Sequence, residues 1–396
     1  MATSISLITH VRLVRPGEGI QPGSLLIRDG RIAAFPEVTD ELAAELAGDG
    51  ATILDGNGRL LTPGMIDVHT HGIGRTCYET DTAALTNGGK ELGRFGVTTV
   101  FPTLVPRTDA AGLATVARIA RAMPSARGVS VPGLHLEGPF VALGGAACST
   151  LAGDLVLLGE LLAAAEGRTR IMSVSPETPG IVPVIERLCE LGIRSFITHT
   201  GASVDQTLAA LDAGATHATH FYDVFPSPPE TDPGVRPVGV VETMLADRRA
   251  TVDFIADGVH VHPMAIRAAV AAKSWRGVML ITDSNIGSGL PPGIHETPWG
   301  YPVRVREGDG ARHAERGFLA GSALTMNRGI ANLLRWLDLP PDQVWAMGTL
   351  NPANLLGLGE CGRLAVGAVA DLVLWDEDLN PRQTWVAGEC VYERAS

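Results

Sequence analysis

Lysine is nearly absent from this chain, and acidic residues outnumber basic ones. Only Lys90 and Lys273 occur among 396 residues, and the formal net charge is −12. Binding to the phosphates of nucleic acid needs a basic surface, so this balance argues against a nucleic-acid partner. Both lysines fall in helical patterns, so we expect neither of them at the end of a strand.

Long apolar runs are missing as well. Crossing a bilayer takes roughly 20 consecutive apolar residues, and no run in this sequence approaches that length. The N-terminus lacks a basic start followed by a continuous apolar stretch, so we expect no secretory signal peptide. Both absences predict a protein without a membrane partner.

Cysteine is scarce and irregularly spaced. The five cysteines are odd in number and fit neither a zinc ribbon nor a disulfide framework. Disulfides are rare in the reducing cytoplasm, so we expect a cytoplasmic protein. We interpret most of these cysteines as small buried apolar residues. They are Cys77, Cys148, Cys189, Cys361 and Cys390.

Both ends of the chain have the pattern of β-strands. The first 60 residues alternate between apolar and polar side chains, and the pairs Asp29-Gly30 and Asn57-Gly58 are typical of hairpin turns. The C-terminal segments GRLAVGAVADLVLWDED and QTWVAGECVYE alternate in the same way. We therefore predict one small β-sandwich domain assembled from residues 1–60 plus 357–396.

Residues 61–356 show a different pattern, in which strand, loop and helix repeat. Eight such units favour a closed parallel barrel, the (β/α)8 or TIM-like fold. A doubly wound open sheet is the rival, but no G-x-G-x-x-G motif follows the first strand. The expected strands are Met65–His71, Thr98–Leu104, Gly133–Phe140, Arg170–Ser175, Arg194–Thr200, Thr216–Tyr222, Thr251–Ala256 and Val278–Asp283.

Possible metal ligands recur at the ends of these expected strands. In a (β/α)8 barrel the carboxyl ends of the strands converge on one face, where residues distant in sequence meet. Imidazole and carboxylate groups suit a divalent cation, zinc above all, although iron, manganese or cobalt also fits. The set predicts that these side chains meet around a metal. Its members are His69, His71, Glu137, His199 and His220, with Asp283 beside them.

Each member alone has a simpler interpretation. His69 and His71 lie two residues apart and face the same side of a strand, yet such a pair is weak evidence by itself. Glu137 could pair with an arginine. A buried carboxylate such as Asp283 is costly unless it is paired or lies near a metal. Together, at the ends of so many strands, these residues are hard to explain as core packing.

Two neighbours of this set have supporting interpretations. Asp67 shares the register of His69 and His71 and can support a ligand from behind. His217 is out of register with His220, so we interpret it as a packed or hydrogen-bonded structural histidine.

Several segments carry a resemblance to a known family. HLEGPF, ATHATHFYD and ADGVHVHP are its specific motifs, while the H-x-H of MIDVHTHG and the aspartate of LITDS belong to a wider superfamily. On these motifs the chain resembles the amidohydrolase superfamily and, within it, the N-acetylglucosamine-6-phosphate deacetylases. The resemblance implies a tighter metal position at Glu137, His199 and His220, and a second one at His69 and His71. Many superfamily members bridge two metals through a carbamylated lysine at strand four. That strand here reads RIMSVSPE, so Glu137 would replace the bridge.

The resemblance also implies an activity, the hydrolysis of an N-acyl amide. For an N-acetyl amino sugar the products would be acetate and a free amine. Asp283 would take a proton from a metal-activated water and pass it to the leaving nitrogen. His260, after strand seven, would contact the substrate. Family members are often homodimers whose subunits complete each other's substrate sites.

The substrate side departs from the family pattern. Relatives carry a histidine shortly after HLEGPF, where this chain has VALGGAACST. Asp223 stands where a neutral asparagine contacts the sugar phosphate, and Thr231 stands where an arginine clamps it. Arg236 lies nearby in sequence and could substitute. Losing a guanidinium and gaining a carboxylate both disfavour a dianion, so we expect N-acetylglucosamine-6-phosphate to be a poor substrate.

Three functions stay open at this point. The leading one is metal-dependent deacetylation of an amino sugar. The second is hydrolysis of a different, non-phosphorylated N-acyl or cyclic amide by the same residues. The third is a metal-binding scaffold or sensor without chemistry, although each metal and proton-transfer position is filled by a competent residue.

Overall fold

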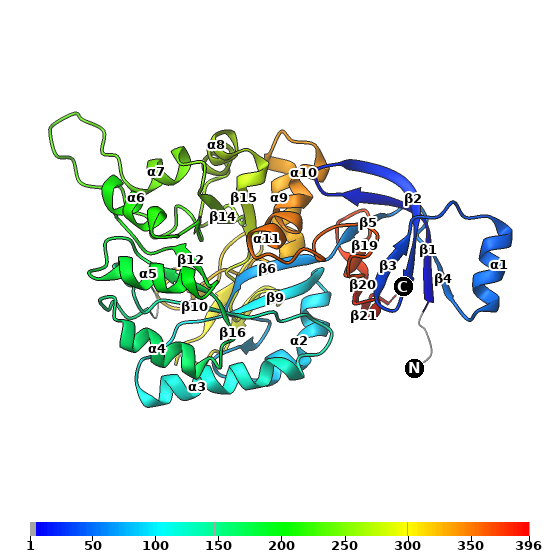
Figure 1. Ribbon diagram of the computed structural model, residues 1–396, viewed down its shortest axis with the longest axis horizontal. Coiled ribbons are helices and arrows are strands. Elements are labelled where there is room, and N and C mark those ends of the chain that lie inside the picture. Colours follow the sequence, from blue (N-terminus) through cyan, green and yellow to red (C-terminus); the bar gives the residue numbers. More distant parts are fainter. Residues whose placement is uncertain (1–4, 146–147, 299, 396) are drawn as a thin grey trace.

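The computed structural model describes residues 5–145, 148–298 and 300–395, and two parts are visible in it (Figure 1). An α/β barrel forms the larger part, and a β sheet built from both ends of the chain forms the smaller one. Within the described ranges, no helix is long and apolar enough to cross a membrane. The predicted TIM-like barrel with a small β domain is confirmed.

The barrel contains eight parallel strands, paired in sequence order from β6 to β15. The ends of the first and last strands meet through backbone hydrogen bonds. Asp283 N donates to His69 O at 2.8 Å, and His71 N donates to Ser284 O at 2.8 Å. The carboxyl ends of the strands are thereby gathered on one face. The strands are β6 (Met65–Thr70), β9 (Val97–Leu104), β10 (Leu134–Glu137), β11 (Thr169–Val174), β12 (Arg194–Ile197), β13 (His217–Ala218), β14 (Thr251–Ile255) and β15 (Val278–Ile281).

Helices follow the strands and cover the outside of the barrel (Figure 1). Several begin at a side chain that accepts a backbone N–H, which satisfies a donor left free at a helix start. Asp109, Asp154 and Ser203 do this for α3, α4 and α6. The helices are α2 (Ala83–Gly93), α3 (Ala110–Ala122), α4 (Leu155–Ala164), α5 (Ile181–Glu190), α6 (Val204–Asp212), α7 (Val240–Ala246), α8 (Pro263–Lys273), α9 (Met326–Trp336), α10 (Pro341–Met347) and α11 (Leu350–Leu355).

Several predicted strands are too long at their carboxyl ends. His71, His199, His220 and Asp283 lie just beyond the strands rather than on them. The backbone of His199, His220 and Asp283 is left-handed, with φ of 46°, 36° and 47°. A positive φ is unfavourable for residues other than glycine and interrupts strand pairing. Such strain is concentrated at functional sites, where the surrounding structure maintains it.

The smaller part is one sheet of eight strands drawn from both termini. β5 joins the two ends, because it pairs parallel with β1 and antiparallel with β19. The predicted hairpin turn at Asp29-Gly30 connects β2 and β3, with φ of 49° and 75°. The strands are β1 (Ile5–Arg15), β2 (Gly19–Arg28), β3 (Arg31–Ala34), β4 (Thr52–Asp55), β5 (Leu60–Pro63), β19 (Leu372–Trp375), β20 (Pro381–Val386) and β21 (Glu389–Glu393).

The turn at Asn57-Gly58 is not a hairpin. Its two residues have the expected positive φ, 51° and 70°, but β4 and β5 do not pair with each other. They lie one after the other along β1, and both run parallel to it. Turn residues determine the local backbone dihedral angles, but they do not determine which strand pairs with which.

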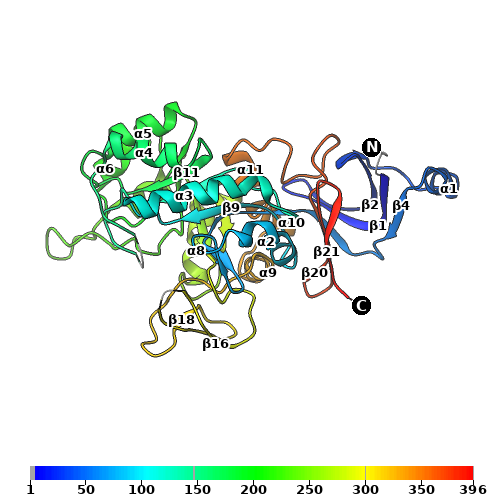
Figure 2. The same ribbon diagram turned by 90° about the horizontal axis from the view of Figure 1, so that it is seen from below.

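A helix and two small sheets add to the expected fold, one sheet being the hairpin of β7 (Gly72–Ile73) and β8 (Thr76–Cys77). Helix α1 (Asp40–Gly48) interrupts the strands of the N-terminal region, and Thr39 accepts from Leu42 N at its start. A small sheet of β16 (Gly293–His295), β17 (Val303–Val305) and β18 (Arg312–His313) follows the last barrel strand, and it projects from the barrel in Figure 2. The domain boundaries at residues 60/61 and 356/357 stay a prediction, and β5 runs past the first of them to Pro63.

Candidate metal centre

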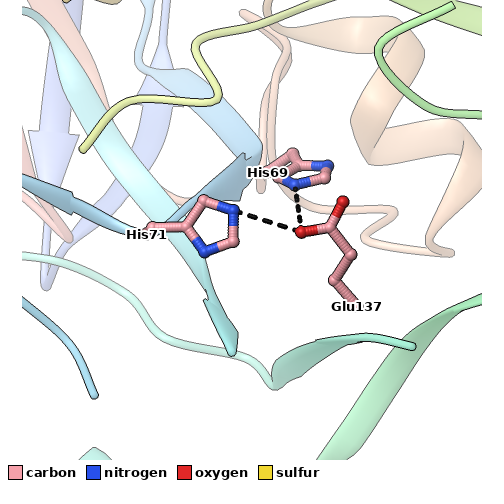
Figure 3. A group of neighbouring side chains, drawn as sticks. All are labelled: His69, His71 and Glu137. Atoms are coloured by element: carbon pink, nitrogen blue, oxygen red, sulfur yellow. Dashed lines mark ion pairs between the residues drawn. The ribbon is translucent and has the colours of Figure 1, made fainter. Parts of the chain in front are cut away.

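Glu137 lies among four histidines at the carboxyl face of the barrel. Its Oε1 is 3.2 Å from His199 Nε2 and 3.1 Å from His220 Nε2. Its Oε2 is 3.5 Å from His69 Nε2 and 3.2 Å from His71 Nε2, and these two contacts are drawn in Figure 3. Each carboxylate oxygen therefore faces a different pair of imidazoles. This division suits a carboxylate that bridges two cations.

Asp283 joins the cluster on the side of His69 and His71. Its Oδ1 is 3.5 Å from His69 Nε2 and 3.3 Å from His71 Nε2. The Asp283 side chain is 17% exposed, against 5% for Glu137. Of these two carboxylates, Asp283 is thus the one with more access to solvent, and the one better placed to exchange a proton.

Attraction between carboxylates and imidazoles shifts the pKa values of this cluster more than burial does. Burial alone would raise the pKa of Glu137, but the histidines, His69 first, lower that pKa well below its usual range. Burial also raises the pKa of Asp283, while His69 and His71 lower it to about 2. Burial lowers the pKa of His220, and Glu137 raises it to about 10. The cluster therefore buries two ionised carboxylates, which require positive charge close by.

Buried hydrogen bonds orient His69 from two sides. Its Nδ1 lies 2.8 Å from Thr219 Oγ1, which leaves Nε2 facing the carboxylates. Behind it, Asp67 accepts from His69 N at 3.4 Å and from Thr282 Oγ1 at 2.5 Å. Asp67 thus links the first and last barrel strands, in the supporting position that its register predicts.

A second buried carboxylate holds the backbone of His220. Asp253 Oδ1 accepts from His220 N at 2.5 Å, and its Oδ2 lies 2.8 Å from His217 Nε2. His217 Nδ1 lies 2.7 Å from Thr251 Oγ1, so both ring nitrogens of His217 have partners outside the cluster. His217 therefore matches its structural interpretation. The role of Asp253 was not anticipated, because an aspartate within a buried strand gives no distinctive sequence signal.

The donor set fits a divalent cation. His69 Nε2, which faces the two carboxylates, is buried and has no hydrogen-bond partner among the described residues. Leaving such an atom unsatisfied costs about 1–3 kcal/mol, which coordination would remove. Two groups of potential ligand atoms lie within 4.8 Å of one another, one formed by His69, His71 and Glu137, the other by Glu137, Cys148 and His199.

Cys148 is the unexpected member of these groups. The expectation that most cysteines are buried is wrong, because of the five only Cys77 is buried. Cys148 is half-buried and lies against the cluster. Burial raises the pKa of its thiol, and the charges of Glu137 and Asp283 raise it further. A single cysteine in a loop has no spacing pattern, so the sequence could not place it here.

His260 and Asp223, both predicted substrate contacts, lie close to the charges of the cluster. His260 Nδ1 is 2.7 Å from Asp257 Oδ2. Burial lowers the pKa of His260, but Asp257, and then Asp283 and Asp223, raise it above its ordinary value. The backbone O of Asp223 is 3.3 Å from His220 Nδ1. The structure therefore brings both residues to the rim of the centre.

Arg236 is not brought to the centre within this chain. Its side chain is 84% exposed, and its Nη2 is 2.9 Å from Glu242 Oε1. It lies with Thr231 on the loop that precedes α7 and extends away from the barrel in Figure 1. Pro-rich segments favour extended backbone, and this loop includes the sequence PSPPETDPG.

Lysine does not contribute to the centre in the part of the chain that the structure describes. Lys273 ends α8, where its Nζ donates to Asp247 O, and Lys90 lies on α2. At strand four, β11 instead carries Ser173, whose Oγ lies 2.6 Å from His135 Nε2. If two metals are bound, a bridging role for Glu137 therefore stays a prediction.

Comparisons with known proteins agree with this architecture. The model of the Amidohydrolase family matches residues 60–391. The N-acetylglucosamine-6-phosphate deacetylase of Vibrio furnissii is 32% identical over 344 residues, which cover 85% of this chain and 84% of the relative. The N-acetylgalactosamine-6-phosphate deacetylase of Escherichia coli O157:H7 is 30% identical over 393 residues, covering 96% and 99%. The crystal structure of N-acetyl-D-glucosamine-6-phosphate deacetylase from Mycobacterium smegmatis has a TM-score of 0.81 and 29% identity, with 98% and 100% coverage. The chain belongs to the amidohydrolase family, and it is an enzyme that hydrolyses amide C–N bonds.

Proposed function

We propose that this enzyme removes the acetyl group from an N-acetylated amino sugar with the help of a divalent metal, giving acetate and a free amine. One observation carries the proposal: the two oxygens of Glu137 face two different pairs of histidines, with Asp283 beside one pair. The similarity to deacetylases of amino-sugar phosphates over most of the chain supports the substrate class.

The division at Glu137 supports two metal positions. Glu137, His199 and His220 would hold one ion, and His69 and His71 would hold a second one with Glu137 between them. Imidazole and carboxylate ligands favour zinc, with iron, manganese or cobalt as alternatives. A divalent cation bound here polarises the amide carbonyl and makes water a stronger acid.

Asp283 is the proposed general base and general acid. It is ionised in this setting and partly exposed, so it can accept a proton from an attacking water. The same carboxyl group then delivers the proton to the leaving nitrogen, which departs as the amine. His69 and His71 fix its position, because both imidazoles lie within 3.5 Å of Oδ1.

His260 and Asp223 are the proposed substrate contacts. Asp257 holds the His260 ring and favours its charged form, so His260 can donate to an oxygen of the substrate. Asp223 places a negative charge at the same rim, which supports a neutral or cationic sugar over a phosphorylated one. A non-phosphorylated N-acyl or cyclic amide is therefore the second candidate.

A homodimer is also part of the proposal. Arg236 points into solvent from a projecting loop, and Val235 and Val238 on the same loop are exposed apolar residues. This surface supports contact with a second copy, which would bring Arg236 to the partner's substrate site. All five cysteines are free, which supports a reducing compartment such as the cytoplasm.

A substrate panel on metal-loaded protein tests the proposal. N-acetylglucosamine, N-acetylgalactosamine, their 6-phosphates and a set of cyclic amides would be compared by release of acetate or amine. Elemental analysis of the same preparation would count the ions, with one or two expected per chain. Turnover of cyclic amides alone would favour the second candidate. Full activity in metal-free protein would refute the metal-dependent mechanism.

A further inference from the structure

Glu177 lies in the segment that follows β11, and it holds the backbone directly after His199. Its Oε2 accepts from Thr200 Oγ1 at 2.5 Å, and its Oε1 accepts from Gly201 N at 2.7 Å. The Thr200 hydroxyl oxygen in turn accepts from Ala202 N at 3.0 Å. Thr200 is fully buried, so its hydroxyl needs a partner inside the protein. One carboxylate therefore fixes both the side chain and the backbone of this turn.

Ser175, from the same segment, holds the backbone on the other side of His199. Its Oγ lies 2.8 Å from Thr198 O and 3.0 Å from His199 O, and it donates to these carbonyls. The hydroxyl is buried as well. The end of β11 thus contacts the chain before and after a proposed metal ligand, although neither Ser175 nor Glu177 belongs to the ligand set.

Thr200 also connects this turn to the one that follows β13. Its N donates to Val224 O at 3.1 Å, and Asp223 N donates to His220 O at 2.9 Å. His220 Nδ1 lies 3.3 Å from Asp223 O, so the ring and the backbone of the second turn are joined. Through Thr200, Glu177 therefore reaches the segment that carries a second proposed metal ligand and a proposed substrate contact.

Both turns have backbone conformations that need such support. The angle φ is 46° at His199, 36° at His220, 78° at Tyr222 and 54° at Val224. A positive φ is uncommon outside glycine, and for a bulky or β-branched side chain it is a clear outlier. Such a conformation persists only where surrounding contacts determine it. The hydrogen bonds that begin at Glu177 provide part of these contacts at both turns.

The geometry of the metal centre depends on these two turns. His199 Nε2 and His220 Nε2 face the same oxygen of Glu137, at 3.2 Å and 3.1 Å. Nε2 lies at the far side of the ring from the backbone, so a small change in the backbone dihedral angles displaces it from the carboxylate. A partner that fixes the backbone of both histidines thus determines whether their nitrogens can meet at one ion.

We propose that Glu177 is a positioning residue of the metal centre, which through Thr200 holds His199 and His220 in place to bind one ion. The same hydrogen bonds hold Asp223 at the rim, so Glu177 also affects how the substrate is placed. The inference rests on the proposed metal-dependent function and deepens it. Residues that orient metal ligands contribute strongly to affinity without touching the ion.

Zinc affinity, measured by chelator competition on the full-length protein, tests the proposal without an activity measurement. Glu177→Gln keeps the size of the side chain but retains only one acceptor oxygen, and Thr200→Val keeps the shape of Thr200 but removes the hydroxyl. Each should weaken zinc binding by roughly 10–100-fold. Thr200→Ser keeps the hydroxyl and should retain the affinity, and Glu186→Gln, an exposed position on α5, is the matched control.

The double variant tests whether the two residues act through one hydrogen bond. The effects of residues in contact are not additive, so Glu177→Gln with Thr200→Val should bind zinc more tightly than the product of the two single losses predicts. Losses that multiply as for independent sites would refute the inference.

Cobalt spectra separate positioning from a general loss of stability. Co²⁺ bound to Glu177→Gln should show visible bands that differ from those of wild type, because the ligands have moved. A variant with a lower urea midpoint but wild-type zinc affinity and cobalt bands would show a purely structural role, and the inference would be wrong while the metal centre stands. If wild type binds neither zinc nor cobalt, the proposed metal-dependent function fails together with the inference.

Discussion

Replacing Asp283 by asparagine isolates proton transfer from the rest of the mechanism. The amide keeps the shape of the carboxyl group next to His69 and His71 but cannot act as a base. Positioned proton transfer contributes roughly 10²–10⁴ in rate, equivalent to about 3–5 kcal/mol of barrier at about 1.4 kcal/mol for each tenfold. The full effect is expected here, because Glu137 is only 5% exposed and already faces four histidines. No other carboxylate of the described cluster is as open to solvent.

The assay is single-substrate turnover of an N-acetyl amino sugar, with the metal content measured on the same sample. Turnover of Asp283→Asn should fall by at least roughly a hundredfold, while the ion at Glu137, His199 and His220 is retained. Asp371→Asn is the matched control, because it makes the same change at a buried aspartate that directly precedes β19 in the smaller part of the molecule. Near-normal turnover of metal-loaded Asp283→Asn would show that the proton travels through another group.

Three further predictions concern other buried or charged groups. Burial raises the pKa of Asp371 from 3.8 to about 6, worth about 3 kcal/mol of stability; this stability is present below pH 3.8 and is lost as the pH rises through 6. Urea unfolding of Asp371→Asn should lack that loss, and an unchanged pH profile would contradict the assignment. Asp253→Asn should weaken metal binding by roughly 10–100-fold in a chelator competition. The reason is that the amide can keep only one of the two contacts of the carboxylate, to His220 N or to His217. Unchanged affinity would show that Asp253 does not position His220. Asp223→Asn combined with Thr231→Arg should raise kcat/KM for N-acetylglucosamine-6-phosphate, since like charges about 4 Å apart repel by about 4 kcal/mol at an effective dielectric near 20. Efficient hydrolysis of that substrate by wild type would refute the last prediction.

Periodic features of the sequence predicted the barrel well. Its strands are largely buried, and several, such as β15 (VMLI), are short apolar runs, as expected of a parallel strand covered on both faces. Helix α1 could have been found, because Thr39 followed by acidic residues is a typical helix start. The strand-like segments on either side of it led to the prediction of strands throughout this region. The pairing of β4 and β5 along β1 could not be read from the turn at Asn57-Gly58, because a turn specifies local dihedral angles and not a distant partner.

The same distinction separates the parts of the centre that could be predicted from those that could not. The expected ligands lie at the ends of barrel strands or just after them, as His69, His71 and Glu137 show. The barrel brings these residues, which are far apart in sequence, close together in space. Cys148 and Arg236 lie on loops, whose course depends on contacts that no local pattern encodes. Gly145 shows this dependence, since its lack of a side chain matters only because the His199 ring lies against it. Relatives that share the barrel can therefore share the metal ligands and still differ in what the loops bring to the metal and to the substrate. The residues at the strand ends therefore predict amide hydrolysis, whereas the preferred metal and sugar depend on loop residues and have to be determined by experiment.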